Sequence, residues 1–225
     1  MTVEDLNVQK ADCTRIIIVR HGESIGNATR RMLGHTDLDL SELGFKQAEC
    51  TAEHLEGVKI DAIYSSDLMR AYNTGMPHAR RRGLEIGREK GLRELYVGAW
   101  EGKPVEEILE NCADMFKLQW HGGFGTFTFP DGEAVMDGAR RFYNTVLKLA
   151  KRHIGQTIMI CAHAAVIRGF WSIIAGIKPE NIVAELPFPT NASYSVCEFD
   201  GNIVKPVEYS CDEHLSEIGI TRVLS

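Results

Sequence analysis

The chain has 225 residues, of which 44% are hydrophobic and 25% charged, a composition typical of a globular protein that can bury a substantial core. Its formal net charge of -6 argues against nucleic acid and anionic membranes as partners, although it leaves room for a local basic pocket. The amino-terminal segment lacks a signal-peptide core, and no apolar run approaches the roughly 20 residues that span a bilayer. We therefore expect a cytoplasmic protein with no nucleic-acid or membrane partner.

The predicted elements alternate between strands and helices. Residues 15–19 form a short, continuously apolar and β-branched run, which predicts a strand buried on both faces. From residue 41 we predict a helix that Ser41 caps and Gly57 follows, and over residues 59–66 a second buried strand. A helix capped by Asp67 comes next, before a short strand around Leu84 to Ile86.

The second half of the chain continues this alternation. Residues 104–120 predict a helix with Pro104 at its first position, and residues 133–153 predict another. Residues 157–162 predict a third buried strand, and residues 164–176 a largely buried helix. Residues 193–199 and 203–210 flank the turn signal "DGN", which predicts a hairpin. The expected fold is α/β, a three-layer sandwich with a mainly parallel central sheet and helices on both faces.

Cationic and titratable side chains follow the three predicted parallel strands. Arg20 and His21 end the first strand, Arg70 lies about one turn into the helix after the second, and His163 follows the third. Ligands of such sheets bind beyond the carboxyl ends of the strands, so these four side chains are expected to converge there. Alone, each has an ordinary structural explanation, such as a surface ion pair or a core histidine. Together they favour an anion site.

The chemistry of these residue types suits phosphoryl transfer. Arginine presents a planar fork of donors to phosphate oxygens, and a neutral histidine can attack phosphorus. The reaction also needs an acid that protonates the departing alkoxide, and a carboxylic acid could supply that proton. Gly22, directly after His21, would allow a sharp turn and a close approach to the ligand.

The segments that carry these residues resemble the histidine phosphatase superfamily, in its phosphoglycerate mutase-like branch and closest to the small phosphatases. The resemblance extends from about residue 15 to residue 199, and six segments occur in the family's order. They are "VRHGES" followed by Asn27, "LGHTDLDLSELGFKQA", "IYSSDLMRAYNTG", "LRELYVGAWEGKP", "PDGEAVMDGARRF" and "IMICAHAAVIRG". The resemblance implies one histidine phosphatase-like domain over residues 1–225, with a helical or loop cap insertion at about 100–132.

The resemblance also implies roles for individual residues. His21 would be the nucleophile that becomes a phosphohistidine, and Glu94 the acid that protonates the leaving oxygen. The phosphate-binding and catalytic positions implied with them are Arg20, Asn27, Arg70, His163 and Ala164. The implied activity is a metal-independent phosphomonoesterase that acts on small phosphorylated metabolites without a cofactor, as a possible homodimer.

Two alternatives stay open at this point. One is a 2,3-bisphosphoglycerate-dependent phosphoglycerate mutase, and the other is a non-catalytic phosphate-binding module. Mutases of the family typically carry Glu-Arg-His-Tyr-Gly at the acid segment, where residues 94–98 of this chain read Glu-Leu-Tyr-Val-Gly. That difference favours a phosphatase. An intact set of Arg20, His21, Arg70 and Glu94 argues against a binding module.

Several local features leave questions for the structure. The family commonly has Gly-Gly after the distal histidine, where this chain has Ala164 and Ala165, so a slightly different loop is expected because alanine avoids positive φ. His121, in "WHGGFG", is a weaker candidate for the distal histidine because no strand precedes it. The aromatic stretch at residues 121–130 could be a lid over the ligand or a surface loop whose rings pack into the core.

The cysteines and the absence of metal motifs complete the expectations. None of the six cysteines forms a CxxC pair, so we expect free and often buried thiols. HxH and HExxH motifs are absent from the sequence, and no metal is expected. The basic run at residues 79–83 is expected to complement a helix dipole in solvent.

Overall fold

The computed structural model describes residues 3–8, 10–112 and 123–221. Its centre is a six-stranded sheet in the order β3-β2-β4-β1-β5-β6. The first four of these strands run parallel, whereas β5 pairs antiparallel with β1, and β6 with β5. The strands are β1 (Thr14–Arg20), β2 (Ala62–Ser65), β3 (Ile86–Arg88), β4 (Thr157–Ala162), β5 (Tyr194–Phe199) and β6 (Val204–Cys211).

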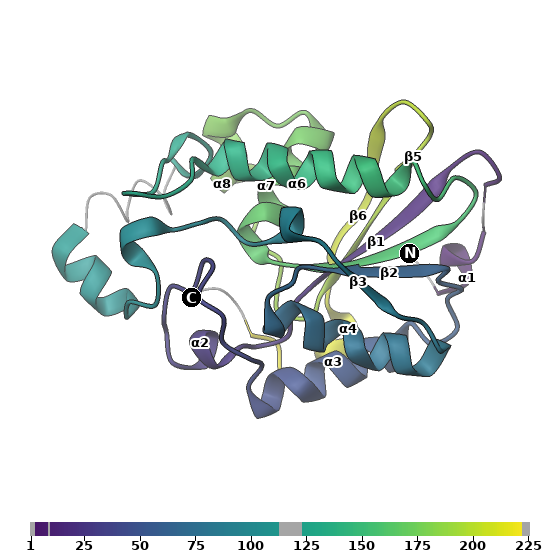
Figure 1. Cartoon of the computed structure of the whole chain (residues 1–225), viewed down its shortest axis with the longest axis horizontal. Helices are drawn as coiled ribbons and strands as arrows, with labels where there is room; N and C mark the ends of the chain where they lie inside the picture. The colour runs from purple at the N-terminus through teal and green to yellow at the C-terminus, as the bar shows by residue number, and fades with distance from the viewer. Residues whose placement is uncertain (1–2, 9, 113–122, 222–225) are drawn as a thin grey trace.

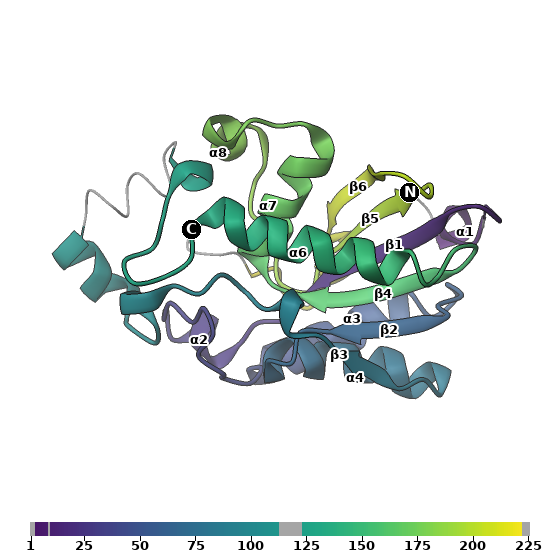
Figure 2. The same cartoon turned by 45° about the horizontal axis from the view of Figure 1, so that its top comes forward.

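Helices cover both faces of this sheet, which confirms the predicted α/β sandwich (Figures 1 and 2). The helices α3 (Glu42–His54) and α4 (Met69–Arg82) lie on one face, and α6 (Val135–Ala150) and α7 (Ala164–Ala175) on the other. Shorter helices are α1 (Val3–Leu6), α2 (Ile25–Ala28) and α8 (Ile182–Glu185), and residues 105–112 are also helical. Single 3₁₀ turns are η1 (Lys90–Leu92), η2 (Gly98–Trp100), η3 (Phe124–Thr126), η4 (Pro179–Asn181) and η5 (Glu213–Leu215).

The central strand β1 shows why the sequence selects this arrangement. Every residue of β1 is buried, and its side chains alternate between two hydrophobic clusters. Ile16 and Ile18 pack into the cluster beneath α6 and α7, whereas Ile17 and Val19 pack into the cluster beneath α3 and α4. A continuous apolar run is what a strand covered on both faces requires. The carboxyl end of β1 is thereby fixed in a rigid environment.

Most predicted elements are confirmed, but the start of α4 is different. The N-cap of α4 is Leu68, and the carboxylate of Asp67 makes no capping bond. Instead Asp67 accepts two hydrogen bonds of 2.7 Å from the Arg93 guanidinium, and Asp37 accepts the Met69 N–H at 2.7 Å. The prediction that Asp67 caps α4 was wrong, because a bidentate arginine holds its carboxylate and a carboxylate from another loop caps the helix.

Smaller differences concern the ends of elements. Ser41 caps α3 as predicted, with its Oγ accepting the Gly44 N–H at 3.1 Å, but the helix ends at His54, before Gly57. The strand expected around residues 84–86 begins only at Ile86, because Gly83 adopts the left-handed conformation and closes α4. The predicted helix over residues 104–120 is described only as far as residue 112, and His121 also lies outside the described residues.

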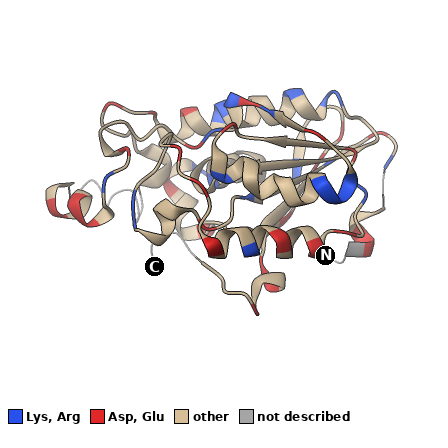
Figure 3. Ribbon diagram, turned by 60° about the horizontal axis from the view of Figure 1, so that its bottom comes forward, with Lys and Arg blue, Asp and Glu red and all other residues tan. Residues whose placement is uncertain are grey.

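The basic run at the end of α4 binds the neighbouring helix α3. Arg80 and Arg81 form ion pairs with Glu49, and Arg81 also reaches Glu53, while the Arg82 guanidinium donates to the Leu55 carbonyl. Figure 3 shows that basic and acidic positions are interspersed along the ribbon. The run therefore joins two helices of one layer, in addition to complementing a helix dipole.

The cysteines and the helix lengths add two observations. No disulfide bond joins the cysteines within the described ranges, where Cys161 and Cys197 are buried and the others are half-buried. In the part of the chain that the structure describes, none of the helices has the length and apolarity needed to cross a lipid bilayer.

Two glycines allow α3 to pack against the loop after β1. A Cβ on Gly22 would lie 2.4 Å from the Gly44 carbonyl oxygen, and one on Gly44 would lie 1.9 Å from the Glu23 carbonyl oxygen. Gly22 has no positive φ, so its role differs from the sharp turn that we expected. Both positions require glycine because two backbone segments pass within van der Waals contact of each other.

We predict that Gly44→Ala destabilises the protein and displaces the loop at Gly22. Overpacking of this kind typically costs about 1–3 kcal/mol, because rigid backbone must move apart. Thermal or urea unfolding measures the loss, with Lys46→Ala on the exposed face of α3 as the control. A Gly44→Ala variant with wild-type stability would contradict the packing described here.

Candidate active site

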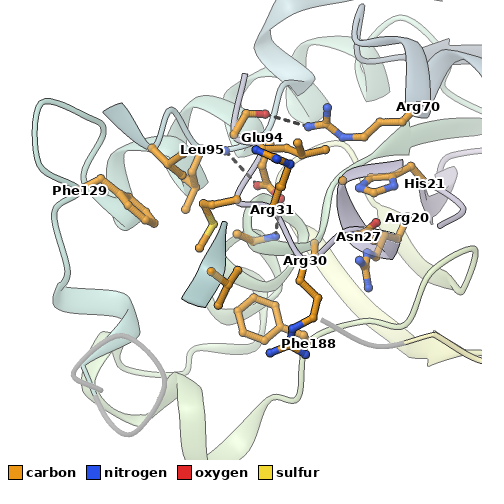
Figure 4. A pocket seen from close by; sticks show the side chains of 18 of the residues that line it. Arg20, His21, Asn27, Arg30, Arg31, Arg70, Glu94, Leu95, Phe129 and Phe188 are labelled. Atoms are coloured by element: carbon orange, nitrogen blue, oxygen red, sulfur yellow. Dashed lines mark hydrogen bonds between the residues drawn. The ribbon is translucent and has the colours of Figure 1, made fainter. Parts of the chain in front are cut away.

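The predicted site residues lie around one cavity at the carboxyl edge of the parallel strands. Arg20 ends β1, Arg70 lies in the first turn of α4 after β2, and His163 links β4 to α7. In Figure 4, Arg20, His21 and Asn27 lie on one side of the cavity and Phe129 lies on the other. Of the predicted residues, the lining includes Arg20, His21, Asn27, Arg70, Glu94 and Ala164, whereas His163 is fully buried beside His21.

His21 is held as a neutral ring with one nitrogen available. Its Nδ1 lies 2.7 Å from the carbonyl oxygen of Gly22, and because a carbonyl only accepts, Nδ1 carries the proton. Burial, and then the positive charges of Arg70 and Arg20, lower the pKa of His21 well below 6.5. The second nitrogen, Nε2, therefore has a free lone pair, as a nucleophile requires.

Arg20 and Arg70 are fully buried cations that are anchored by backbone carbonyls. Arg20 Nη1 donates to the Pro189 carbonyl at 2.6 Å, while Arg70 donates to the carbonyls of Thr36 at 2.9 Å and Gly34 at 2.8 Å. Burial lowers the pKa of Arg20 to about 9 and that of Arg70 to about 10, which leaves both charged at neutral pH. The Nε atoms of both are buried without a partner among the described residues. An anion in the cavity would satisfy them.

His163 supplies further donor or acceptor capacity next to His21. The centroids of the two imidazole rings are 5.3 Å apart, and both nitrogens of His163 are buried without a described partner. Burial, and then the charge of Arg70, lower its pKa well below 6.5. His163 is the N-cap of α7, and the two alanines after it enter the helix without positive φ. The expected penalty for alanine in place of glycine therefore does not arise here.

Glu94 reaches the same site from a loop on the far side of the sheet edge. Its carboxylate accepts the N–H groups of Ala165 and Val166, each at 3.1 Å, and its own neighbour Leu95 at 2.9 Å. The first two donors belong to the amino-terminal turn of α7. The Glu94 carboxyl group is thereby held in the wall of the cavity that His21 also lines.

Asn27 contributes from the short helix α2. Its Oδ1 accepts from the backbone N–H of Ser24 at 3.1 Å and from the Asn191 side chain at 3.2 Å. Asn191 also donates to the His21 carbonyl at 3.1 Å and accepts from the Thr221 hydroxyl at 3.1 Å. The loop that carries His21 is thus bound to a buried asparagine that our sequence analysis did not identify.

The outer wall of the cavity combines cations and aromatic rings. Arg30 and Arg31 line it together with Phe124, Phe129 and Phe188 (Figure 4). Phe124 and Phe129 are almost fully buried, so these rings belong to the core and to the cavity wall at once. The two explanations offered for the stretch at residues 121–130 are therefore compatible within residues 123–130.

The described residues contain no group of three or more His, Cys, Asp or Glu side chains arranged for a metal ion. The cavity is lined by the guanidinium groups of four arginines, the imidazole of His21 and the carboxyl group of Glu94, a charge distribution that suits an anion. Ala164, the first residue of α7, also lines it. Donors at a helix start commonly bind phosphate oxygens.

Comparisons with known proteins identify the class. Residues 16–212 match the family described as histidine phosphatase superfamily (branch 1). Phosphoserine phosphatase 1 of Hydrogenobacter thermophilus is 32% identical over 206 residues, which are 90% of this chain and 95% of that protein. The chain therefore belongs to the histidine phosphatase superfamily, and it is an enzyme of the phosphatase type.

Solved structures agree with this assignment. Bacillus stearothermophilus YhfR matches with a TM-score of 0.85 and 28% identity, covering 90% of this chain and all (100%) of that one. A mycobacterial glucosyl-3-phosphoglycerate phosphatase in complex with VO3 matches with a TM-score of 0.81 and 27% identity, covering 88% of this chain and 99% of that one. The fold described above is thus the fold of known histidine phosphatases.

We predict that His163→Leu stabilises the protein while it removes phosphate binding. A buried imidazole without a hydrogen-bond partner lowers the free energy of unfolding by about 1–3 kcal/mol, and a leucine side chain carries no such penalty. Because the folded protein resists protonation of His163 and the unfolded chain does not, stability falls as pH decreases below 6.5. Leucine removes the share of this loss that His163 contributes, whereas the other buried histidines keep theirs. The advantage of the variant should therefore widen toward acid pH.

Thermal unfolding with and without inorganic phosphate measures both effects. The wild type should show a rise in Tm with phosphate that the variant lacks. A destabilised variant that still responds fully to phosphate would contradict the assignment of His163 to the anion site.

Proposed function

We propose that this protein is a metal-independent phosphomonoesterase that acts through a phosphohistidine intermediate on small phosphorylated metabolites. The observation that carries the proposal is the neutral His21 ring, with Nδ1–H bound to a carbonyl, beside two buried guanidinium groups with unpartnered Nε atoms. Arg20, Arg70, His163 and the Ala164 N–H would hold three phosphoryl oxygens, and Asn27 would contact the same group.

In the first step, the Nε2 lone pair of His21 attacks phosphorus and the bond from phosphorus to the ester oxygen breaks. Glu94, in its carboxylic acid form, gives its proton to that oxygen, so the leaving group departs as a neutral alcohol. The buried cations stabilise charge on the equatorial oxygens of the transferring group.

In the second step, water replaces the alcohol. The Glu94 carboxylate takes a proton from this water while its oxygen bonds to phosphorus, and the bond between phosphorus and Nε2 breaks. Phosphate is released, and Glu94 is again a carboxylic acid. Both steps use the same donors around the phosphoryl group, so the protein needs no rearrangement between them.

The leaving group would lie against the outer wall of the cavity. Arg31 lines this wall. Its side chain donates one described hydrogen bond, to the Gly102 carbonyl at 2.8 Å, and forms no ion pair with a described residue. Arg30, in contrast, is paired with Glu106 at 2.6 Å. We propose that the preferred alcohol carries a carboxylate or another anionic group near its apolar part. The two relatives above are named for phosphoserine and for glucosyl-3-phosphoglycerate, and both compounds fit this description.

Residues 123–132, the described end of the insertion expected at about 100–132, would cap the leaving-group side of the cavity, since Phe124 and Phe129 come from this stretch. A mutase would use the same residues, but it would have to exclude water from the phosphoryl group until the substrate has reoriented in the site. Isomerisation of phosphoglycerate that depends on a bisphosphoglycerate primer would favour the mutase. Binding of phosphate without any turnover would favour a binding module.

We predict a burst of the first product from an aryl phosphate, equal to one equivalent per site, before steady turnover. The burst requires a slow second step; rapid quenching at low temperature makes it visible. His21→Ala should abolish both the burst and the turnover while the protein still binds vanadate.

The activity of the wild type should survive EDTA. Loss with EDTA that added metal restores, or turnover by His21→Ala, would contradict the proposal.

A second prediction concerns substrate choice. Arg31→Met should raise KM roughly twofold to fivefold for an alkyl phosphate that carries a carboxylate, because an ion pair of the exposed Arg31 guanidinium with that carboxylate is lost. KM for p-nitrophenyl phosphate should change little, since that leaving group has no anionic substituent for Arg31. Arg140→Met, on the exposed face of α6, is the matched control. Equal changes in KM for both esters would show that Arg31 does not read the leaving group.

A further inference from the structure

Arg141, on α6, grips the segment that carries Glu94. Its Nη1 donates to the carbonyls of Gly91 at 3.0 Å and Arg93 at 2.9 Å, and its Nη2 donates to the carbonyl of Glu94 at 3.0 Å. One guanidinium group thus satisfies three backbone carbonyls within four residues of chain. This segment is otherwise a short 3₁₀ turn followed by extended backbone, with little regular structure of its own.

Glu133 binds both Arg141 and the backbone of Tyr96, which follows Glu94 in the chain. Its two carboxylate oxygens each accept a 2.9 Å hydrogen bond from Arg141, through Nε and Nη2. Oε2 also accepts the Tyr96 N–H at 3.2 Å, and the Glu133 N–H donates to the Tyr96 carbonyl at 2.8 Å. Burial raises the pKa of Glu133, but the Arg141 hydrogen bonds and charge outweigh it and lower the pKa overall. The carboxylate therefore stays ionised.

The opposite side of the segment contacts the loop that binds Arg70. His35 Nε2 donates to the Glu94 carbonyl at 2.8 Å, so this oxygen has two donors, His35 and Arg141. His35 lies between Gly34 and Thr36, the two residues whose carbonyls accept from Arg70. The backbone of the acid is thereby fixed between α6 and the anion site.

We infer that Glu133 and Arg141 form a positioning pair for the general acid, a role that rests on the proposed function of Glu94. The carboxylate of Glu94 is held by the start of α7, and the carbonyl of Glu94 is held by Arg141 on α6. Both the side chain and the backbone of Glu94 are therefore fixed. Acid catalysis depends on this placement, because a displacement of about 1 Å can cost roughly 100-fold in rate. The pair contacts neither the phosphoryl site nor the leaving group, and acts through Glu94.

The leaving group makes this role measurable. An aryl phosphate releases a stable phenolate and needs little help from an acid, whereas an alkyl phosphate releases an alkoxide that must be protonated. We would measure kcat/KM for p-nitrophenyl phosphate and for an alkyl phosphate on the same preparations of Arg141→Lys and Glu133→Gln. This quantity reports departure of the leaving group even where the second step limits kcat. The folded fraction cancels in the ratio of the two values, so simple destabilisation does not move it.

The expected result is a fall of roughly tenfold to 100-fold in the ratio of alkyl to aryl kcat/KM for both variants. Lysine keeps the charge of Arg141 but cannot bind three carbonyls and a carboxylate at once. Arg140→Lys, the same change one residue earlier, should leave the ratio at the wild-type value because Arg140 is exposed and pairs with Asp137.

The variant Glu94→Gln distinguishes the acid role of Glu94 from the positioning role of Glu133 and Arg141. It should lower the same ratio by roughly 100-fold or more if Glu94 is the acid. If Glu94→Gln lowers the ratio but Glu133→Gln and Arg141→Lys do not, the positioning role is wrong and the proposed function stands. If Glu94→Gln leaves the ratio unchanged, both the acid role and the positioning pair fall.

Discussion

The structure depends on keeping two guanidinium cations and two neutral imidazoles buried together at one edge of a sheet. Such a cluster is unfavourable in itself, because the charges are desolvated and like-signed and several polar atoms lack partners. Backbone carbonyls of Pro189, Gly34 and Thr36 offset part of this cost by anchoring the outer nitrogens of the arginines. Under the proposed function, a dianionic phosphoryl group would satisfy the polar atoms that lack partners among the described residues, and this gain would supply the affinity for the anion.

Rigid surroundings make this arrangement possible. β1 lies between two hydrophobic clusters, and the close contact of Gly22 with Gly44 fixes the chain directly after His21. The buried cations that line the cavity also help burial to lower the pKa of His21, so the positive charge of the cavity and the neutral state of His21 belong to one electrostatic environment. Glu94 is brought to this environment by α7 and by Arg141, elements that come from later in the chain.

Much of this could be predicted from the sequence. The apolar run before Arg20 and His21, and the strand preceding His163, gave the parallel sheet and its functional edge, because buried strands and their ends have strong local signals. Glu94 came only from resemblance to a family, since no local pattern marks the acid. Contacts between distant segments could not be predicted: Asp67 pairs with Arg93 instead of capping α4, and Asn191 holds the His21 loop. Arg31 and Arg141 have no local signature either, because an arginine in a loop or on a helix is usually solvated.

The protonation state of His21 tests the central claim most directly. Imidazole ¹⁵N NMR of the ligand-free protein reports the tautomer and charge of this ring, with His21→Gln to assign its signals. The account predicts that His21 is still a neutral Nδ1–H tautomer at about pH 6.5, where an ordinary histidine is half protonated, because burial and two arginines oppose a further positive charge. Titration of His21 with a pKa near 6.5, or a neutral ring that carries its proton on Nε2, would contradict it.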